Sequence, residues 1–345
     1  MTEKSGDNSR CGMLSALLIA CGLAVTVFAE PAPPSWSPTS IFAPVSTPAQ
    51  SILDLSVFVL TVTGAIFVVV FSLLAYAVVK FRKRGADSGE PAQVYGSTQV
   101  ELAWTVIPIL IVVILFLATA RVIASIQNAV HPGNAMEVTV IGHQFWWEYR
   151  YPALKVVTAN ELHIPVGEPI ILTLLSADTD HSFWVPRLGG KTDLIPNHPN
   201  SMWMDPRETG LYLGQCAQYC GTQHAKMLLR VIVQTREEFD RWIQEQSRPT
   251  EVGDNVSEGQ KIFERTACVN CHAVAGTAAK GRYGPDLTHL MSRTTIASGA
   301  APNTLENLRR WMQDPSVIKP GSKMPAMGLS NPELNALTAY LGTLR

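Results

Sequence analysis

The sequence predicts a membrane protein of several domains: a two-helix transmembrane hairpin, then a small β-sandwich or barrel, then a helical domain. Three observations support this fold class. The length of 345 residues suits two or three domains. A hydrophobic content of 47% is high for a soluble chain. The apolar residues fall first in long uncharged runs, then in short alternating runs, and finally at helical spacing.

The N-terminus resembles a cleaved export signal. Two basic residues precede a mostly apolar run over 13–29, which closes on small or aliphatic residues at the positions that a signal peptidase recognises. We therefore expect a signal peptide over 1–29 and a Pro-rich N-terminal segment over 30–50. An alternative is a lipoprotein cleavage box at "LIAC" with lipidation of Cys21, although the apolar run continues beyond that cysteine.

Two uncharged runs are long enough to cross a membrane. They extend from Leu55 to Val79 and from Leu102 to Ala120, and at about 1.5 Å per residue each covers roughly the 30 Å hydrocarbon core. We place the hairpin at 51–126. The length of the runs disfavours the alternative of two buried helices in a soluble protein. The loop between them is expected in the cytoplasm, with both chain ends outside, because it begins with Lys80, Arg82, Lys83 and Arg84.

Short β-branched or alternating runs come next: "EVTVIG", "PIILTLLS", "LYLGQC" and "LLRVIVQT". They predict a small β-sandwich or barrel over 134–243. A polar linker over 244–256 follows, and helical patterns return over 257–345. In the last helix Asn331 can act as N-cap, with Pro332 in the first turn.

The charge balance excludes nucleic acid as a partner. Lys and Arg number 27 and Asp and Glu number 28, which gives a net charge of −1. Such a chain has no basic excess with which to neutralise a phosphate backbone.

The stretch "GQCAQYCGTQHAKM" predicts a metal site. Cys216, Cys220, His224 and Met227 are soft or borderline donors, a set that favours copper, since zinc is seldom bound by methionine. Two cysteines on one loop can each bridge two ions, and a further imidazole should come from an earlier strand. His181, in "DTDHSFWVP", meets that requirement. A disulfide between the two cysteines is the alternative, and it would leave the histidine and the methionine unexplained.

Three segments of the β region resemble a known family. "DTDHSFWVP", "LGGKTDLIP" and the cysteine loop are closely similar to subunit II of the haem-copper cytochrome c oxidases, over about residues 50 to 245. The resemblance implies two transmembrane helices that carry an external cupredoxin domain with a binuclear copper centre, CuA. It implies bridging by Cys216 and Cys220, imidazole ligands His181 and His224, and weaker ligands Met227 and the backbone carbonyl of Gln218.

"GHQFWWEYRY" resembles the aromatic stretch that lies near the copper in this family, where an indole receives electrons. Phe145 stands where the family usually has Trp, and Trp146 and Trp147 follow it. This departure fits a chain with its own electron donor, which has less need of a docking place for a separate cytochrome. The alternative is that these aromatic residues only pack in the core.

"CVNCH" predicts a covalently bound haem. Cys268 and Cys271 have the spacing that forms thioethers with the haem vinyl groups, and His272 supplies the proximal ligand. A zinc or thiol-redox motif is the alternative. The region resembles a small class I cytochrome c, an all-α domain of the kind fused to subunit II in one oxidase subtype.

Met324, in "GSKMPAMG", is the expected distal ligand, because that resemblance places a Met-Pro pair after the haem histidine. Met327 and then Met291 are the alternatives. "GPDL" resembles the loop that holds the haem histidine through the carbonyl oxygen of Pro285.

Two more residues take their expected roles from the resemblance alone. Glu101, in "ELAWTVIP", matches an acidic residue at the mouth of a proton pathway into subunit I, and the alternative is an ordinary helix-end charge. Gln218 stands where the family usually has Glu, whose carboxylate binds a magnesium ion shared with subunit I. An amide should weaken that site, because magnesium favours charged oxygen ligands.

The resemblance implies an oxidase subunit in a bacterial inner membrane, with its copper and haem domains on the periplasmic face. Electrons from an external donor, such as a small cytochrome c or a cytochrome bc complex, would pass from haem c to CuA and then to haem a of subunit I. Oxygen reduction there is coupled to proton translocation, and subunit III is a further expected partner. The linker should keep the haem domain at high effective concentration.

Three alternatives remain at this point: a subunit of a CuA-containing nitric oxide reductase, a membrane-anchored electron carrier, and a copper-delivery protein. Copper delivery would not need a haem. Ubiquinol-oxidase subunits of this family lack the copper ligands found here.

Overall fold

The computed structural model describes residues 39–345, except for 83–92, 94, 131–132, 134 and 249–256. The predicted signal peptide and the lipidation alternative at Cys21 lie outside the described residues, as do residues 30–38 of the Pro-rich segment. Lys83 and Arg84 of the basic loop also lie outside them.

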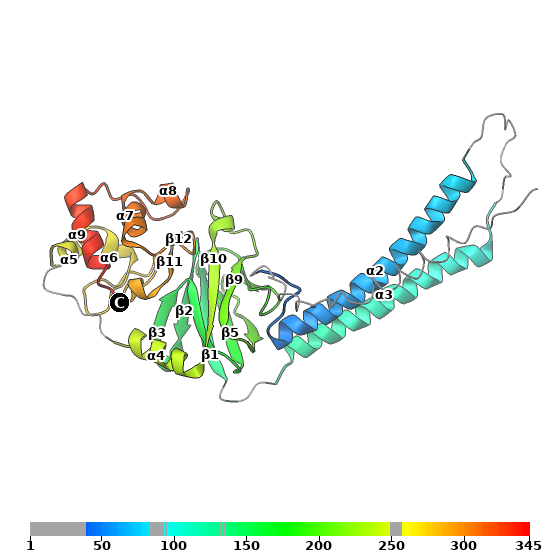
Figure 1. The fold of residues 1–345 in the computed structure, drawn as a ribbon, viewed down its shortest axis with the longest axis horizontal. Helices are drawn as coiled ribbons and strands as arrows, with labels where there is room; N and C mark the ends of the chain where they lie inside the picture. Colours follow the sequence, from blue (N-terminus) through cyan, green and yellow to red (C-terminus); the bar gives the residue numbers. More distant parts are fainter. Residues whose placement is uncertain (1–38, 83–92, 94, 131–132, 134, 249–256) are drawn as a thin grey trace, which may run out of the picture. The chain divides into compact units, whose positions relative to one another are not determined.

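Two long helices, α2 (Thr47–Lys80) and α3 (Thr98–Gln127), form the predicted hairpin and run side by side (Figure 1). Its bounds are slightly wider than the predicted 51–126. Both helices are long and apolar enough to cross a membrane, and the most apolar stretch of each is not buried inside the protein. Such continuous exposed apolar surface is stable in lipid or against other apolar helices. The hairpin therefore anchors the chain in a membrane.

The first turn of α2 is bound to the β domain. Ser46 caps the helix by accepting a hydrogen bond from Ala49 N (3.3 Å), and its own hydroxyl donates to the carbonyl oxygen of Leu188 (2.6 Å). The carboxylate of Asp205 accepts from Thr47 N (2.6 Å). These bonds fix the start of the membrane helix on the domain that holds the candidate metal ligands.

The β domain consists of two five-stranded sheets, in the orders β3-β2-β1-β5-β8 and β4-β10-β9-β6-β7 (Figure 1). β1 pairs in parallel with β5 and β4 with β10, and the other neighbours are antiparallel. Alternate side chains of β10 (Leu229, Val231 and Val233) are buried, as the period of two predicts. The sandwich is as predicted, with strands β1 (Met136–His143), β2 (Trp146–Tyr151), β3 (Val156–Ala159), β4 (Glu161–Pro165), β5 (Ile170–Ser176), β6 (His181–Trp184), β7 (Thr192–Leu194), β8 (Asn200–Met204), β9 (Gly210–Cys216) and β10 (Leu228–Gln234), and the short η1 (Pro152–Leu154).

A short helix, α4 (Arg236–Gln246), packs on the β domain. It begins at a capping box formed by Thr235 and Glu238. Trp242 is buried on its inner face, with its ring 5.5 Å from that of Tyr151. The predicted linker over 244–256 overlaps the last turn of this helix, and its residues 249–256 lie outside the described part of the chain.

The C-terminal domain is helical, as predicted, and adds one short β-ribbon. α5 and α9 cross closely at Gly259, where a Cβ would collide with the carbonyl oxygen of Ala336. This close crossing forms one wall of a separate hydrophobic core. The elements are α5 (Ser257–Arg265), α6 (Cys268–Cys271), η4 (Leu290–Ser292), β11 (Thr295–Ile296), β12 (Ala301–Pro302), α7 (Leu305–Gln313), α8 (Pro315–Ile318) and α9 (Asn331–Leu341).

The N-cap of α9 differs from the prediction, which was Asn331. Ser330 caps the helix, because the carboxylate of Glu333 accepts from both Ser330 N (2.9 Å) and Ser330 Oγ (2.7 Å). The amide oxygen of Asn331 accepts instead from Arg309 (2.7 Å). Pro332 lies in the first turn, as predicted.

Candidate metal centre and haem cavity

The predicted copper donors meet at one end of the second sheet. β6 begins at His181, β9 ends at Cys216, and Met227 directly precedes β10, and these three strands are neighbours in the order β10-β9-β6. The loop after β9 returns Cys220 and then His224, on the short η2 (His224–Lys226), to the same place. Sheet pairing therefore joins His181 to a loop that is distant in sequence.

The donor atoms form a compact cluster. The sulfur atoms of Cys216 and Cys220 are 3.9 Å apart. His181 Nδ1 lies 3.9 Å from the first sulfur, and His224 Nδ1 lies 3.7 Å from the second. Met227 Sδ is 3.7 Å from the sulfur of Cys220. The structure thus brings together all five side chains that the sequence assigned to copper.

This cluster fits copper and not a disulfide. A disulfide requires sulfur atoms about 2.05 Å apart, whereas the distance here is 3.9 Å and both cysteines are free. The hydrogen bond between the two thiols, with further bonds from His181, lowers the pKa of Cys216, and the same contact raises the pKa of Cys220. Sulfur ligands beside imidazole and thioether donors form a soft set that favours copper, which binds cysteine as the deprotonated thiolate. These residues therefore fit a copper site.

Gln218 contributes through its backbone. Its carbonyl oxygen lies 3.2 Å from the sulfur of Cys216 and accepts a hydrogen bond from that thiol, while its amide side chain is exposed. The carbonyl is thus placed for the weak copper contact that the resemblance implies. The side chain is free to face a partner subunit.

Asp178 is a candidate positioning residue that the sequence prediction missed. Its carboxylate binds Nε2 of His181 (2.8 Å), so that Nδ1 faces the thiols. Burial raises the pKa of Asp178, but the hydrogen bonds from His181, Gln144 N and Thr179 N lower it further, and the net shift is downward. An acidic residue three positions before a suspected histidine ligand was the available signal.

The aromatic stretch lies beside both candidate sites. Trp147 is fully buried, with its ring 6.0 Å from that of His181. Trp146 stacks on His143 at 4.1 Å, and both Trp146 and Phe145 line the cavity of the C-terminal domain. All three predicted aromatic residues are buried, so packing accounts for part of their role, and electron relay stays a prediction.

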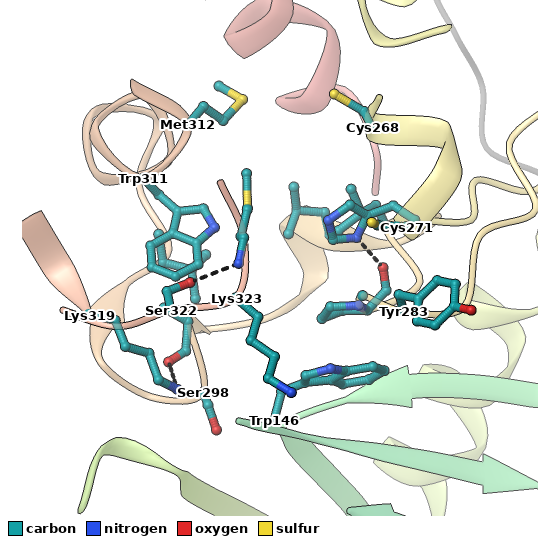
Figure 2. A pocket seen from close by; sticks show the side chains of 18 of the residues that line it. Trp146, Cys268, Cys271, Tyr283, Ser298, Trp311, Met312, Lys319, Ser322 and Lys323 are labelled. Carbon is teal, nitrogen blue, oxygen red and sulfur yellow. Dashed lines mark hydrogen bonds between the residues drawn. The ribbon is translucent and has the colours of Figure 1, made fainter. Parts of the chain in front are cut away.

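A cavity of about 660 Å³ lies beside the "CVNCH" motif. The side chains of Cys268 and Cys271 face Trp311 and Met312 across it (Figure 2). Its volume falls within the roughly 300–1,000 Å³ of known ligand pockets. Its lining is mostly apolar, with Phe263, Leu287, Leu290, Ile296, Leu308, Leu337 and Leu341. This space suits a flat apolar macrocycle such as haem.

His272 is held in one orientation. Its Nδ1 donates to the carbonyl oxygen of Pro285 (2.7 Å), which confirms the predicted role of "GPDL" and leaves Nε2 for iron. Burial lowers the pKa of His272 and favours the neutral, ligating form. Gly284 is required here, because a Cβ would lie 2.5 Å from the imidazole ring. The residues present therefore fit a haem.

Three methionines line the cavity. Met324 and Met327, the first and second predicted ligands, are both there. Met291 packs against the hydrophobic core and is not among the lining residues. Met312, which the sequence prediction overlooked, lines the cavity from α7 and is buried. Sulfur donors on helix faces are easily taken for core residues, and the assignment of Met324 remains a prediction.

Glu101 lies in the first turn of α3 and is exposed. An acidic residue at that position also interacts favourably with the helix dipole. Its role in proton entry therefore remains a prediction.

Comparison with known proteins matches each part of the chain. Residues 34–122 match the family "Cytochrome C oxidase subunit II, transmembrane domain", residues 154–235 match its "periplasmic domain", and residues 256–345 match "Cytochrome c". Cytochrome c oxidase subunit 2 of Alkalihalophilus pseudofirmus is 38% identical over 311 residues, which cover 88% of this chain and 90% of the relative. That of Bacillus sp. strain PS3 is 34% identical over 284 residues, with coverage of 76% and 79%. The periplasmic domain of oxidase subunit II of Bradyrhizobium japonicum is 29% identical, covers 34% of this chain and 96% of its own, and has a TM-score of 0.33.

Soft metal donors on a membrane-anchored β-sandwich, together with a cavity beside a haem-attachment motif, define an electron-transfer protein anchored in a membrane. The extent of the sequence match makes the family specific: the chain belongs to cytochrome c oxidase subunit II, in the form with a fused C-terminal cytochrome c domain. Membership implies copper in the β domain, haem in the C-terminal domain, and other oxidase subunits as partners.

Proposed function

We propose that this chain is the electron-entry subunit of a respiratory oxidase. It takes electrons from an external donor, such as a small cytochrome c or a cytochrome bc complex, at its haem c domain and delivers them through a binuclear CuA site to haem a of subunit I. Subunit I reduces oxygen to water with proton translocation, and subunit III completes the complex. The haem and copper domains face the periplasm of a bacterial inner membrane.

One observation gives the main support for electron transfer from the haem to the copper site. Residues 144–146 of the β domain line the cavity beside "CVNCH", and Trp147, the next residue, packs against His181 of the copper cluster. A four-residue stretch thus borders both sites. This arrangement suits a chain in which the haem domain passes electrons to the copper domain.

The residues of the chain act by holding and enclosing the two sites. When bound, copper and haem each accept and release single electrons. Asp178 and the carbonyl oxygen of Pro285 fix the rings of His181 and His272, so that neither ligand has to turn when charge changes. Burial of the cysteine pair at 2% and 3% exposure keeps water from the two thiols.

The quinol oxidases of this family offer a contrast. The quinol oxidase subunit 2 of Bacillus cereus is 28% identical over 225 residues. The present chain has a complete set of copper donors in contact distance, and a direct quinol oxidase has no use for them. We therefore favour a cytochrome c oxidase.

The test uses the purified oxidase complex with Cys216→Ser and, as control, Ser201→Ala on the exposed side of β8. An external reductant should still reduce the haem domain of Cys216→Ser, while oxygen consumption stops and the control keeps both. Normal oxygen consumption by Cys216→Ser would contradict the relay. A wild-type complex that reduces nitric oxide and not oxygen would identify the nitric oxide reductase alternative instead.

A further inference from the structure

A buried carboxylate of the β domain is bonded to the haem domain. Glu161, at the start of β4, is 1% exposed. Its oxygens accept from Thr294 N (3.0 and 3.1 Å), Thr294 Oγ1 (2.6 Å), Thr295 N (2.9 Å) and Thr295 Oγ1 (2.9 Å). Its one ion-pair partner among the described residues, Arg230, is 4.0 Å away. Among the described residues, the hydrogen bonds to this carboxylate thus come from the other domain.

Such an arrangement has an energetic consequence. A carboxylate that is buried is stable only when hydrogen bonds replace its lost water, and bonds to a charged acceptor are stronger than those between neutral groups. Thr294 and Thr295 offer four donors from two successive residues. The carboxylate of Glu161 therefore has these hydrogen bonds only while the two domains are in contact, and in this sense it anchors one domain to the other.

Lys319 makes a second buried contact. This lysine of the haem domain is 3% exposed and donates to the carbonyl oxygen of Phe145 (2.8 Å) in the β domain and to that of Ala297 (3.2 Å) in its own. In Figure 2 it extends beside Ser298 at the edge of the haem cavity. More hydrogen bonds join the same two surfaces, from Gln223 to Pro320, from Lys226 to Ile318 (3.1 Å) and from Ser298 to Leu228 (2.7 Å).

Gln144 connects the two candidate redox sites directly. Its Nε2 donates to the carbonyl oxygen of Cys220 (2.6 Å), and its backbone N donates to Asp178 (2.7 Å), which holds His181. Its Oε1 accepts from Lys323, the residue before Met324. A single side chain therefore joins a bridging cysteine of the copper site to the loop with the expected haem ligand.

We propose that the haem domain is permanently docked on the copper domain, with Glu161 as the anchor, and that Gln144 is the bridging residue for electron transfer between the two sites. This inference rests on the proposed function, in which the haem passes electrons to the copper site. It differs from the expectation of a merely tethered domain, which must find its docking position before each transfer. A docked pair transfers without that search, through a continuous path of covalent and hydrogen bonds.

The docking is tested by hydrogen exchange on the full chain, a measurement independent of oxidase activity. In Glu161→Ala the amides of Thr294 and Thr295 should exchange roughly tenfold to hundredfold faster, which is the loss expected on removal of a charged acceptor. In the control Glu168→Ala, which removes an exposed ion pair with Arg236 (3.1 Å), they should not change.

An internal amide separates docking from folding. Asn303 N donates to Thr294 O within the haem domain (2.9 Å), and it should stay protected in Glu161→Ala. Unchanged exchange at both threonines would overturn the anchor. Faster exchange that includes Asn303 would also overturn it, because Glu161 would then stabilise the haem domain itself.

The bridge is tested by flash reduction of the haem and observation of electron arrival at copper. The wild-type rate should not depend on added glycerol, whereas that of Glu161→Ala should fall as viscosity rises. Gln144→Met, which keeps the side-chain length without the hydrogen bonds, should be severalfold slower at any viscosity, and so should Lys323→Met. The exposed Lys280→Met is the control and should match the wild type.

Two failures are distinguishable. If the wild type transfers no electron from haem to copper, the proposed function is wrong. If it transfers them at a rate that falls with viscosity, or if Gln144→Met is as fast as wild type, the proposed function stands and this inference is wrong.

Discussion

The copper site and the haem site are built in opposite ways. The copper donors lie on or next to strands that pair within one sheet, and the closest donors are 3.7 to 3.9 Å apart. The haem residues lie on α6, on loops and on α7, around a cavity of about 660 Å³ between the core of this domain and residues 144–146 of the β domain. Backbone pairing assembles the first site, whereas the second needs its ligand as part of the core. The two domains should therefore respond differently to the loss of their cofactors.

The largest difference is expected when haem attachment is prevented with Cys268→Ala and Cys271→Ala together. Without haem, the apolar walls of a cavity of about 660 Å³ have no group to pack against, so the haem domain loses a large part of its core contacts. The haem domain should be unfolded by circular dichroism and hydrogen exchange. Wild-type protein prepared without copper should keep a folded β domain, and an unfolded β domain there would contradict the comparison.

The next prediction concerns the haem ligand. Met324→Ala should abolish the weak far-red absorption of an iron–thioether bond in the oxidised domain, whereas Met327→Ala should keep it, because only one sulfur can hold the distal position. Met312→Leu serves as a second control, since this side chain fills the wall of the cavity from α7. If Met327→Ala loses the band and Met324→Ala keeps it, our assignment is wrong.

Acid should lower the stability of the β domain by protonating His163. This histidine stacks on Trp242 at 4.2 Å and bonds to Gln234 (2.9 Å), and burial lowers its pKa to about 4. The unfolded chain takes up a proton near the ordinary pKa of about 6.5, before the folded one does. Between about pH 6.5 and 4 the free energy of unfolding should therefore fall by up to about 3 kcal/mol from this group, and stability is retained above that range.

Urea unfolding of the copper-free protein at several pH values measures this effect. The difference between wild type and His163→Gln should change with pH across that range, while Glu161, whose charge acts on His163, is the same in both. A constant difference would show that His163 is not the responsible group.

Copper affinity should depend on Asp178. Asp178→Asn removes the charge that orients His181 and strengthens its Nδ1 as a donor, so we expect a roughly tenfold to hundredfold weaker copper site. Titration of copper into the copper-free protein, followed by its visible absorption, gives the affinity. The exposed Asp193→Asn on the adjacent β7 is the matched control and should bind as wild type does. Equal affinity of both variants would remove Asp178 from the site.

The sequence predicted the parts of this molecule that depend on local pattern. Apolar run length gave the hairpin, and the short spacings of "CAQYC" and "CVNCH" gave most of the ligands. His181 lies 35 residues from Cys216, so no local spacing identifies it. It was predicted because the copper site needs a further imidazole and this histidine follows an earlier strand. Glu161 was missed because its donors are 133 residues away, and nothing local marks a carboxylate that another domain will bury.

Boundary details show the same limit on a smaller scale. Ser330 and Asn331 are both good N-cap residues, and the choice between them depends on Glu333, which reaches back to Ser330. Met312 falls on an amphipathic helix, where a methionine and a leucine are equivalent by pattern. The difference between core residue and cavity residue exists only after the helices have packed.

The smallest expected effect concerns Gln218, where the resemblance implies a glutamate that binds magnesium at the interface with subunit I. The carbonyl contact of Gln218 to the copper site should be the same in Gln218→Glu, because every residue has that oxygen and here it already lies 3.2 Å from the sulfur of Cys216. The exposed side chain is different: an amide oxygen brings no charge to offset the desolvation of a hard cation, so the wild type should hold the ion less tightly.

Cells grown with manganese, which can replace magnesium there, allow the resonance of bound Mn²⁺ to be compared in purified wild-type oxidase and Gln218→Glu during dialysis. Gln218→Glu should retain manganese longer with an unchanged copper spectrum. Equal retention would contradict the charge argument, and an altered copper spectrum would show that this side chain also acts on the copper ligands.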